Sequence, residues 1–207
     1  MKVLILEGSL RYDKESSTTY VLSTMVAQEF KKHNAEVKLI HLANYDLSLG
    51  YEFQPKKKDN SSDFFTSIAD ADIIIMATPT WWGHHSSLVQ KAIERMTAFD
   101  DYAIAHKINV LYNKTFGCLI TGDIDGFQHI TADLLCFATE LGMCIPPQAS
   151  VVFRALKEGD HDINQVKQDK VMIDTIKQFC ATQVTFSKAI TKVNLGGISQ
   201  QSTNQKA

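Results

Sequence analysis

The chain has 207 residues, with 21 Lys and Arg against 23 Asp and Glu, so that its formal net charge is −2. This length fits one domain with a sizeable core, and the near-neutral charge gives no electrostatic reason to expect nucleic acid or an anionic membrane as a partner. No apolar run approaches bilayer-spanning length, and the apolar part of the N-terminus is too short for a signal peptide. The sequence therefore predicts a soluble, cytoplasmic protein.

Short apolar runs alternate along the chain with stretches of helical spacing. The apolar runs predict strands at Lys2–Glu7, Glu36–Leu42, Asp72–Thr78, Lys114–Thr121 and Ser150–Phe153. Helical spacing predicts helices at Ser17–His33, Ser61 or Ser62 to Ala69, His84–Met96, Asp125–Leu141 and Asn164–Lys192. Residues 99–114 receive no assignment, and the Gly-, Ser-, Gln- and Asn-rich tail 194–207 is expected to be disordered.

This alternation predicts an α/β fold with a parallel sheet and helices on both of its faces. Five strands and five helices fit the flavodoxin-like strand order 2-1-3-4-5, in one domain over residues 1–193. In that order the loops after the first, third and fourth strands meet at the carboxyl edge of the sheet, where ligands bind. These three loops are therefore the candidate site.

The four cysteines, Cys118, Cys136, Cys144 and Cys180, form no C-x-x-C pair. Cys118 falls in a predicted strand and Cys136 in a predicted helix. This arrangement favours small buried hydrophobes in a reducing compartment over disulfides or a zinc site.

The loop after the third strand, Thr78–Gly83, carries Pro79, Gly83 and two adjacent indoles, Trp81 and Trp82. Two indoles at this edge suit a flat, conjugated ring better than a sugar or a bare phosphate. The alternative is that both are core or subunit-interface aromatics, and this loop alone would favour that alternative.

The loop after the first strand is rich in hydroxyl groups and precedes a helix. Its polar residues are Ser9, Arg11, Ser16, Ser17, Thr18 and Thr19. Hydroxyls, backbone N–H groups, the helix dipole and an arginine can together hold a phosphate, although an ordinary Ser/Thr helix cap explains the pattern equally well. The loop matches neither a dinucleotide-binding turn nor a P-loop, and His41-Leu42 stands where a ribose-binding acid would follow the second strand.

The loop after the fourth strand, Thr121–Phe127, contains two glycines and two acids. Gly122 and Gly126 allow a close backbone approach to a ligand, and Asp123 or Asp125 can accept from a ring N–H or cap the next helix. Paired carboxylates also raise acid–base chemistry or a hard metal, but the carboxylates are too few for a metal site. No nucleophile elbow and no Ser or Cys with a base partner is found, so no catalytic side chain is predicted.

Taken together, the three loops resemble the flavodoxin-like NADPH-dependent FMN reductase family. The segments that carry the resemblance are Gly8–Arg11 with Ser16–Thr19, Thr78–Gly83, Thr121–Gly126 and Leu141–Ala149. The match runs to about Phe153. Tyr12-Asp13-Lys14-Glu15 departs from the smaller residues common in the family, and the chain lacks the compact cysteine cluster of the iron–sulfur branch.

The resemblance implies an FMN-dependent oxidoreductase that uses NADPH or NADH and reduces a quinone, a flavin or a similar acceptor. It assigns the FMN phosphate to Ser9, Arg11, Ser16, Ser17, Thr18 and Thr19. It assigns the isoalloxazine to Pro79, Thr80, Trp81, Trp82 and Gly83, and its pyrimidine side to Thr121, Gly122, Asp123, Asp125 and Gly126. It also implies a homodimer or homotetramer. The main alternative is a flavodoxin-type electron carrier, although such carriers are usually strongly acidic.

Overall fold

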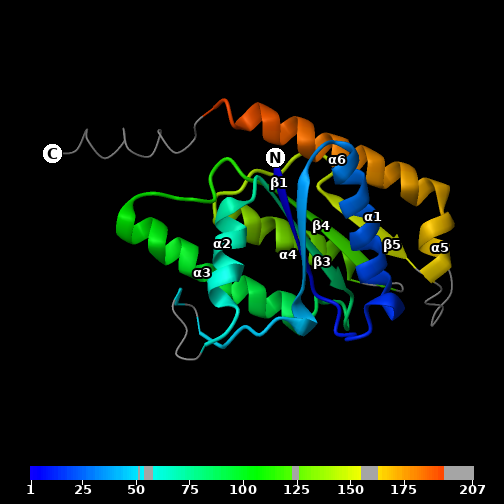
Figure 1. Ribbon diagram of the computed structural model, residues 1–207, viewed down its shortest axis with the longest axis horizontal. Helices are drawn as coiled ribbons and strands as arrows, with labels where there is room; N and C mark the ends of the chain where they lie inside the picture. Colours follow the sequence, from blue (N-terminus) through cyan, green and yellow to red (C-terminus); the bar gives the residue numbers. More distant parts are fainter. Residues whose placement is uncertain (51, 54–57, 123–125, 155–162, 194–207) are drawn as a thin grey trace.

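A parallel sheet forms the centre of the computed structural model, which describes residues 1–50, 52–53, 58–122, 126–154 and 163–193 (Figure 1). Within these residues the sheet has five strands in the order β2-β1-β3-β4-β5. The strands are β1 (Lys2–Glu7), β2 (Glu36–His41), β3 (Ile73–Pro79), β4 (Thr115–Gly122) and β5 (Ser150–Arg154). This confirms the predicted α/β class and strand order.

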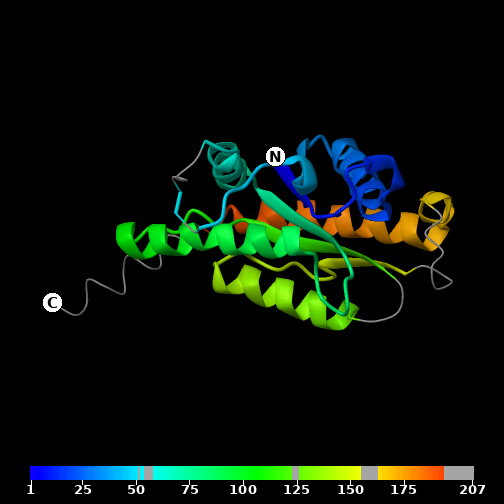
Figure 2. The same ribbon diagram turned by 90° about the horizontal axis from the view of Figure 1, so that it is seen from below.

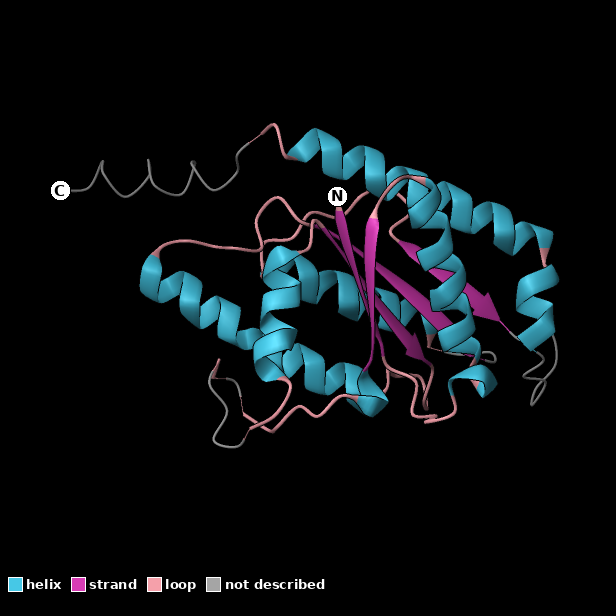
Figure 3. Ribbon diagram, in the orientation of Figure 1, coloured by secondary structure: helices cyan, strands magenta, loops and turns pink. Residues whose placement is uncertain are grey.

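Helices cover both faces of the sheet (Figure 3). The α-helices are α1 (Thr18–Lys32), α2 (Ser61–Asp70), α3 (Ser87–His106), α4 (Phe127–Glu140), α5 (Ile163–Gln168) and α6 (Lys170–Ile190), and the 3-10 turns are η1 (Lys14–Ser16) and η2 (Leu42–Asn44). Figure 2 shows α1 and α4 on opposite sides of the strands.

The core is divided between the two faces because successive side chains of a strand point in opposite directions. Leu4 and Leu6 of β1 pack with residues of α2, α3 and α4. Val3 and Ile5 pack with residues of α1, α5 and α6. Burial on both faces explains why each strand reads as an almost continuous apolar run in the sequence.

Most predicted boundaries differ from the observed ones by one or two residues, but the third helix is shifted. It begins at Ser87 rather than His84, because His84 is paired with Trp81 by two backbone hydrogen bonds of 2.8 and 2.9 Å. Ser86 caps the helix by accepting from the Val89 N–H. The helix ends at His106 instead of Met96, so it includes part of the segment that received no assignment.

The predicted helix Asn164–Lys192 is two helices, α5 and α6. The break falls at Asp169, whose carboxylate accepts from the backbone N–H groups of Val171 and Met172 at 2.9 and 3.1 Å. The acid therefore caps a new helix inside a run whose apolar spacing is continuous.

Replacing Asp169 with alanine should lower the free energy of unfolding by about 1 kcal/mol, because two N–H groups at the start of α6 lose their acceptor. Asp174→Ala is the control, since Asp174 forms an exposed pair with Lys177 and such pairs contribute little. Urea unfolding of both variants checks the difference, and equal losses would contradict the capping role.

Two of the cysteines are buried, as predicted. Cys118 in β4 and Cys180 in α6 are enclosed, and burial raises the pKa of the Cys118 thiol to about 12. Cys136 is correctly placed in a helix, but its predicted burial is wrong because it lies on the exposed side of α4. None of the helices in the described part of the chain combines the length and hydropathy that crossing a bilayer requires.

Candidate functional site

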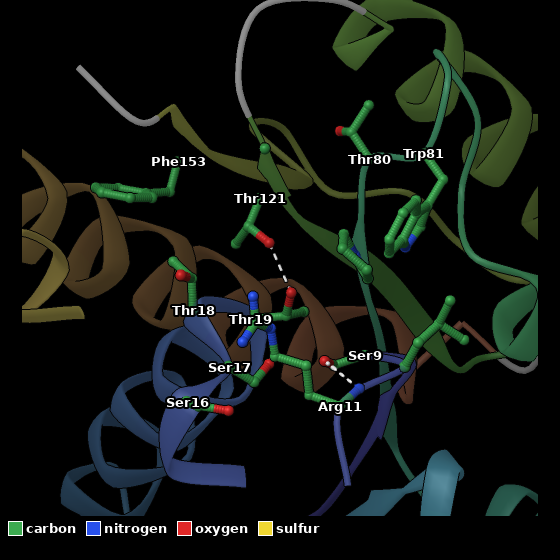
Figure 4. A pocket seen from close by; sticks show the side chains of 13 residues that line it. Ser9, Arg11, Ser16, Ser17, Thr18, Thr19, Thr80, Trp81, Thr121 and Phe153 are labelled. Atoms are coloured by element: carbon green, nitrogen blue, oxygen red, sulfur yellow. Dashed lines mark hydrogen bonds between the residues drawn. The ribbon is translucent and has the colours of Figure 1, made fainter. Parts of the chain in front are cut away.

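A cavity of about 250 Å³ lies at the carboxyl edge of the sheet, where β1, β3 and β4 end (Figure 4). Its lining residues are Ser9, Leu10, Arg11, Ser16, Ser17, Thr18, Thr19, Pro79, Thr80, Trp81, Thr121, Gly122 and Phe153. The three loops chosen from the sequence therefore meet around one cavity. This is the position at which open α/β sheets bind their ligands.

Some predicted site residues do not line this cavity in the described part of the chain. Trp82, Gly83 and Gly126 lie outside the lining. Asp123 and Asp125 lie outside the described residues, as does the tail 194–207. The sequence reasoning missed Leu10 and Phe153. For Phe153 a signal existed, because the predicted strand order places the end of the fifth strand beside the fourth, where Phe153 and Thr121 are register partners.

The first loop combines a capped helix start with hydroxyl groups on the cavity wall. Ser17 caps α1 by accepting from the Tyr20 N–H at 3.1 Å, so the capping alternative is correct for this residue. Thr19 Oγ1 lies 2.6 Å from Thr121 Oγ1, which ties the start of α1 to the end of β4. Figure 4 shows the Arg11 side chain extending toward this helix start. These groups are donors suited to an anion.

The departures from the family pattern lie away from the cavity wall. Among the described residues, Asp13 and Glu15 are absent from the lining, and Asp13 instead caps the short turn η1 by accepting from the Glu15 N–H at 3.2 Å. The two acids therefore do not border the place where an anion would sit.

The second loop is a tight turn that separates the two indoles. Trp82 and Gly83 have φ values of 51° and 78° between the paired residues Trp81 and His84, as in a type I′ turn. Trp81 is 48 % exposed and lines the cavity, whereas Trp82 is 92 % exposed. Figure 4 shows Trp81 and Phe153 on opposite sides of the cavity, with Thr121 between them. Only Trp81 is thus placed to contact a ligand there.

Thr80 supplies a buried polar atom beside this turn. Its N–H donates to the Thr121 carbonyl at 2.7 Å, which fixes the turn to β4. Its Oγ1 is buried and has no hydrogen-bond partner among the described residues. A buried hydroxyl without a partner is costly unless something else pairs with it, such as a bound ligand.

The glycines of the third loop allow close packing of protein on protein. A Cβ on Gly122 would lie 2.7 Å from Thr80 Cβ. Gly126 has a φ of 82°, and a Cβ there would lie 2.4 Å from the Cα of Gly83. Both glycines therefore let the third loop pack against the second, and Gly122, unlike Gly126, also lines the cavity.

Beneath the first loop lies a buried acid–histidine pair. Glu7 and His41 are register partners at the ends of β1 and β2, with side chains 0 % and 2 % exposed. Glu7 Oε1 accepts from the Ser9 N–H at 2.9 Å, and Oε2 faces His41 Nδ1. His41 Nε2 lies 3.0 Å from the Arg11 carbonyl oxygen. Burial raises the pKa of the Glu7 carboxyl above its ordinary value.

Sequence reasoning missed this pair because it treated His41 only as the absence of a ribose-binding acid. The available signal was a titratable residue, Glu7 or His41, at the end of each of two neighbouring strands. Parallel pairing then brings the two side chains together.

The family model for NADPH-dependent FMN reductases matches residues 1–157. The chain belongs to this family, which confirms the resemblance seen in the three loops. Membership implies FMN as the cofactor.

Two curated relatives show how far the similarity extends. The chain is 26% identical over 159 residues to 8-demethyl-8-aminoriboflavin-5'-phosphate synthase of Streptomyces davaonensis. This alignment covers 72% of this chain and 62% of the relative. It is 27% identical over 153 residues to a Mycobacterium bovis protein named divalent metal cation transporter MntH, covering 72% of this chain and 22% of that protein. The chain thus spans less than two thirds of either relative.

Among solved structures, RosB with the bound intermediate 8-demethyl-8-formylriboflavin-5'-phosphate superposes with a TM-score of 0.85 at 20% identity. The alignment covers 100% of this chain and 88% of that structure. At this identity the likeness supports the fold.

Proposed function

We propose that the chain is an FMN-dependent oxidoreductase that takes reducing equivalents from NADPH or NADH and passes them to a small acceptor such as a quinone or a flavin. The observation that carries the proposal is one cavity that joins a hydroxyl-rich helix start to an aromatic turn. The first suits a phosphate and the second a planar ring. The Streptomyces relative, by its name, concerns a riboflavin-5'-phosphate derivative, which likewise has a planar ring and a phosphate.

The residues of the cavity divide into two groups by chemistry. Arg11 and the hydroxyls of Ser9, Thr18 and Thr19 would hold the phosphate through charge-assisted and neutral hydrogen bonds. The Ser16 hydroxyl donates instead to the Asp13 carbonyl at 2.9 Å. Pro79, Thr80 and Trp81 would lie along the ring, where Trp81 excludes water and Thr80 Oγ1 finds a partner. Bound FMN would supply the hydride and electron chemistry, and the protein supplies orientation and electrostatics.

We also propose that Trp81, and not Trp82, contacts the ring. Trp81→Ala should shift the visible absorption spectrum of bound flavin and weaken its binding by about tenfold, because an aromatic contact is lost. Trp82→Ala should change neither, since that indole is 92 % exposed and lies outside the cavity lining. Spectra and titrations of both variants decide the assignment, which fails if Trp82→Ala has the larger effect.

The test of the function is a purified sample with FMN, NADPH or NADH, and a quinone. Flavin absorbance together with steady nicotinamide oxidation is expected. Bound flavin without turnover of either nicotinamide would favour the electron carrier, against which the net charge of −2 argues. No flavin binding at all would reject both redox functions.

We propose a homodimer or homotetramer as the assembled form. Ile104 and Ile108, near the end of α3, are 71 % and 53 % exposed in a single copy, and contact with a second copy would cover them. Light scattering coupled to size-exclusion chromatography measures the mass, and a monomer at working concentrations would contradict this proposal.

A further inference from the structure

The Glu7–His41 pair holds the backbone of the loop that carries Ser9 and Arg11. Glu7 fixes the Ser9 N–H, and His41 reaches the Arg11 carbonyl. Within the loop, Ser9 Oγ accepts from the Arg11 N–H at 3.2 Å. Each end of this three-residue loop is therefore attached to a buried side chain, while Ser9 and Arg11 face the cavity.

The partners of His41 determine how many protons the pair contains. A carbonyl oxygen can only accept a hydrogen bond, so His41 Nε2 must carry a proton to bond Arg11. Nδ1 faces a carboxyl oxygen, and that contact is a hydrogen bond only if a further proton lies on one side of it. The pair is then either a carboxylic acid with a neutral imidazole or a carboxylate with an imidazolium. In both forms it holds one shared proton and has no net charge.

We infer that Glu7 and His41 are positioning residues whose shared proton holds the Ser9–Arg11 loop in its phosphate-binding shape, and that losing this proton in alkaline solution releases the loop. The part of this inference that concerns phosphate rests on the proposed function. The part that concerns the proton rests on the contacts alone.

Loss of the proton leaves one of the two His41 contacts unpaired in either tautomer. With the remaining proton on Nε2, the Nδ1 lone pair faces the Glu7 carboxylate. With the proton on Nδ1, the Nε2 lone pair faces the Arg11 carbonyl. The hydrogen bond to the carboxylate is the stronger one because it is charge-assisted, so the contact that is lost is the one to Arg11. The loop therefore loses its attachment at Arg11.

Burial of the pair favours the form that holds this proton. The titratable groups that face it are Lys14 from η1 and Tyr20 from α1, whose ring packs edge-on against His41. Arg11 faces it with its backbone carbonyl. Toward β3 the described strand partner of Glu7 is the uncharged Ala77. Burial is the largest effect and raises the pKa of Glu7, whereas the contact with His41, the bond from the Ser9 N–H and the charge of Lys14 each favour the carboxylate. Because this folded-state pKa is raised, the stability that the proton contributes is lost as the pH rises through it.

The test measures the dissociation constant of FMN between about pH 7 and pH 9 for the wild type and for Glu7→Gln. A glutamine amide at this position can accept from the Ser9 N–H and donate to His41 Nδ1, so it imitates a carboxyl that cannot lose its proton. Wild-type affinity should fall by about tenfold over this range, whereas that of Glu7→Gln should stay constant. Riboflavin is the control ligand, since it has the same ring and no phosphate, and its affinity should show no such difference between the two proteins.

Two results would overturn the inference: a wild-type FMN affinity that does not change with pH, or a Glu7→Gln affinity that falls in parallel with it. His41→Phe, which keeps a ring against Tyr20, should weaken the binding of FMN by about tenfold at pH 7 and the binding of riboflavin much less. If that variant does not fold, the pH comparison with Glu7→Gln decides.

Nitrogen NMR of His41 in the flavin-free protein tests the shared proton separately. The Nδ1 resonance should move with pH in the wild type and stay fixed in Glu7→Gln, and a fixed wild-type resonance would refute the shared proton. Absence of FMN binding at every pH would reject the proposed function. The NMR measurement would still show whether Glu7 and His41 share a proton, because it needs no flavin.

Discussion

Arg11→Ala is expected to weaken FMN binding by about 1–3 kcal/mol, which is roughly a fivefold to 150-fold rise in the dissociation constant. Arg11 lines the cavity beside the start of α1 and forms no ion pair with any residue that the structure describes. Its charge is therefore available to a phosphate. Quenching of FMN fluorescence measures the constant, and riboflavin should bind the variant and the wild type almost equally.

Lys14→Ala is the matched control for this prediction. Lys14 lies on the same stretch of chain, but its Nζ sits 5.6 Å from the centre of the Tyr20 ring, and it is not part of the cavity lining among the described residues. The Lys14→Ala variant should lose no more than a few tenths of a kcal/mol of FMN binding free energy, since only a long-range attraction between the two charges is removed. Equal losses in the two variants would show that net charge, and not a direct contact, attracts the phosphate.

Gly126→Ala is expected to lower the free energy of unfolding by about 2–5 kcal/mol. A left-handed φ of 82° costs an alanine about 1–2 kcal/mol. The new Cβ would also lie 2.4 Å from backbone atoms of Gly83, and overpacking of this kind typically costs about 1–3 kcal/mol. Backbone cannot move aside as a flexible side chain can, so the two loops must separate. Urea unfolding measures the loss, and FMN affinity should fall with it.

Gly83→Ala separates the two causes. Gly83 has almost the same φ, 78°, but a Cβ there would meet no described atom within 4 Å. Gly83→Ala should therefore lower the free energy of unfolding only by the cost of the left-handed φ, about 1–2 kcal/mol. If Gly83→Ala is as destabilising as Gly126→Ala, the close approach of the two loops contributes nothing.

The fold could be predicted from the sequence because its cause is local and repeated. Strands buried on both faces give continuous apolar runs, and the helices between them give a period of 3.6. Boundaries that depend on one capping side chain or on the backbone pairing of a turn could not be predicted in this way. Asp169 interrupts a helix whose apolar spacing continues through it, and the pairing of Trp81 with His84 delays the start of α3.

The candidate site was predictable to the extent that it consists of loops following strands. The alternation of strands and helices brings Ser9, Thr80 and Thr121 to one edge, and the cavity includes all three. The roles of Trp82 and Gly126 depend on turn conformation, which residue types alone do not define. The Glu7–His41 pair depends on register, since one residue of slip would place the two side chains apart.

The order of the strands has a consequence for how the chain folds, because β1 lies between β2 and β3. Val3 pairs with Ile73, and Thr121 pairs with Phe153, so strands far apart along the chain must meet before the sheet is complete. Pairing over such distances is slow, because the intervening chain must first be closed into a loop. The cavity is complete only once β5 has joined. A flavin can bind only to the completed fold and therefore stabilises the native state alone. It should slow unfolding and leave the rate of folding unchanged.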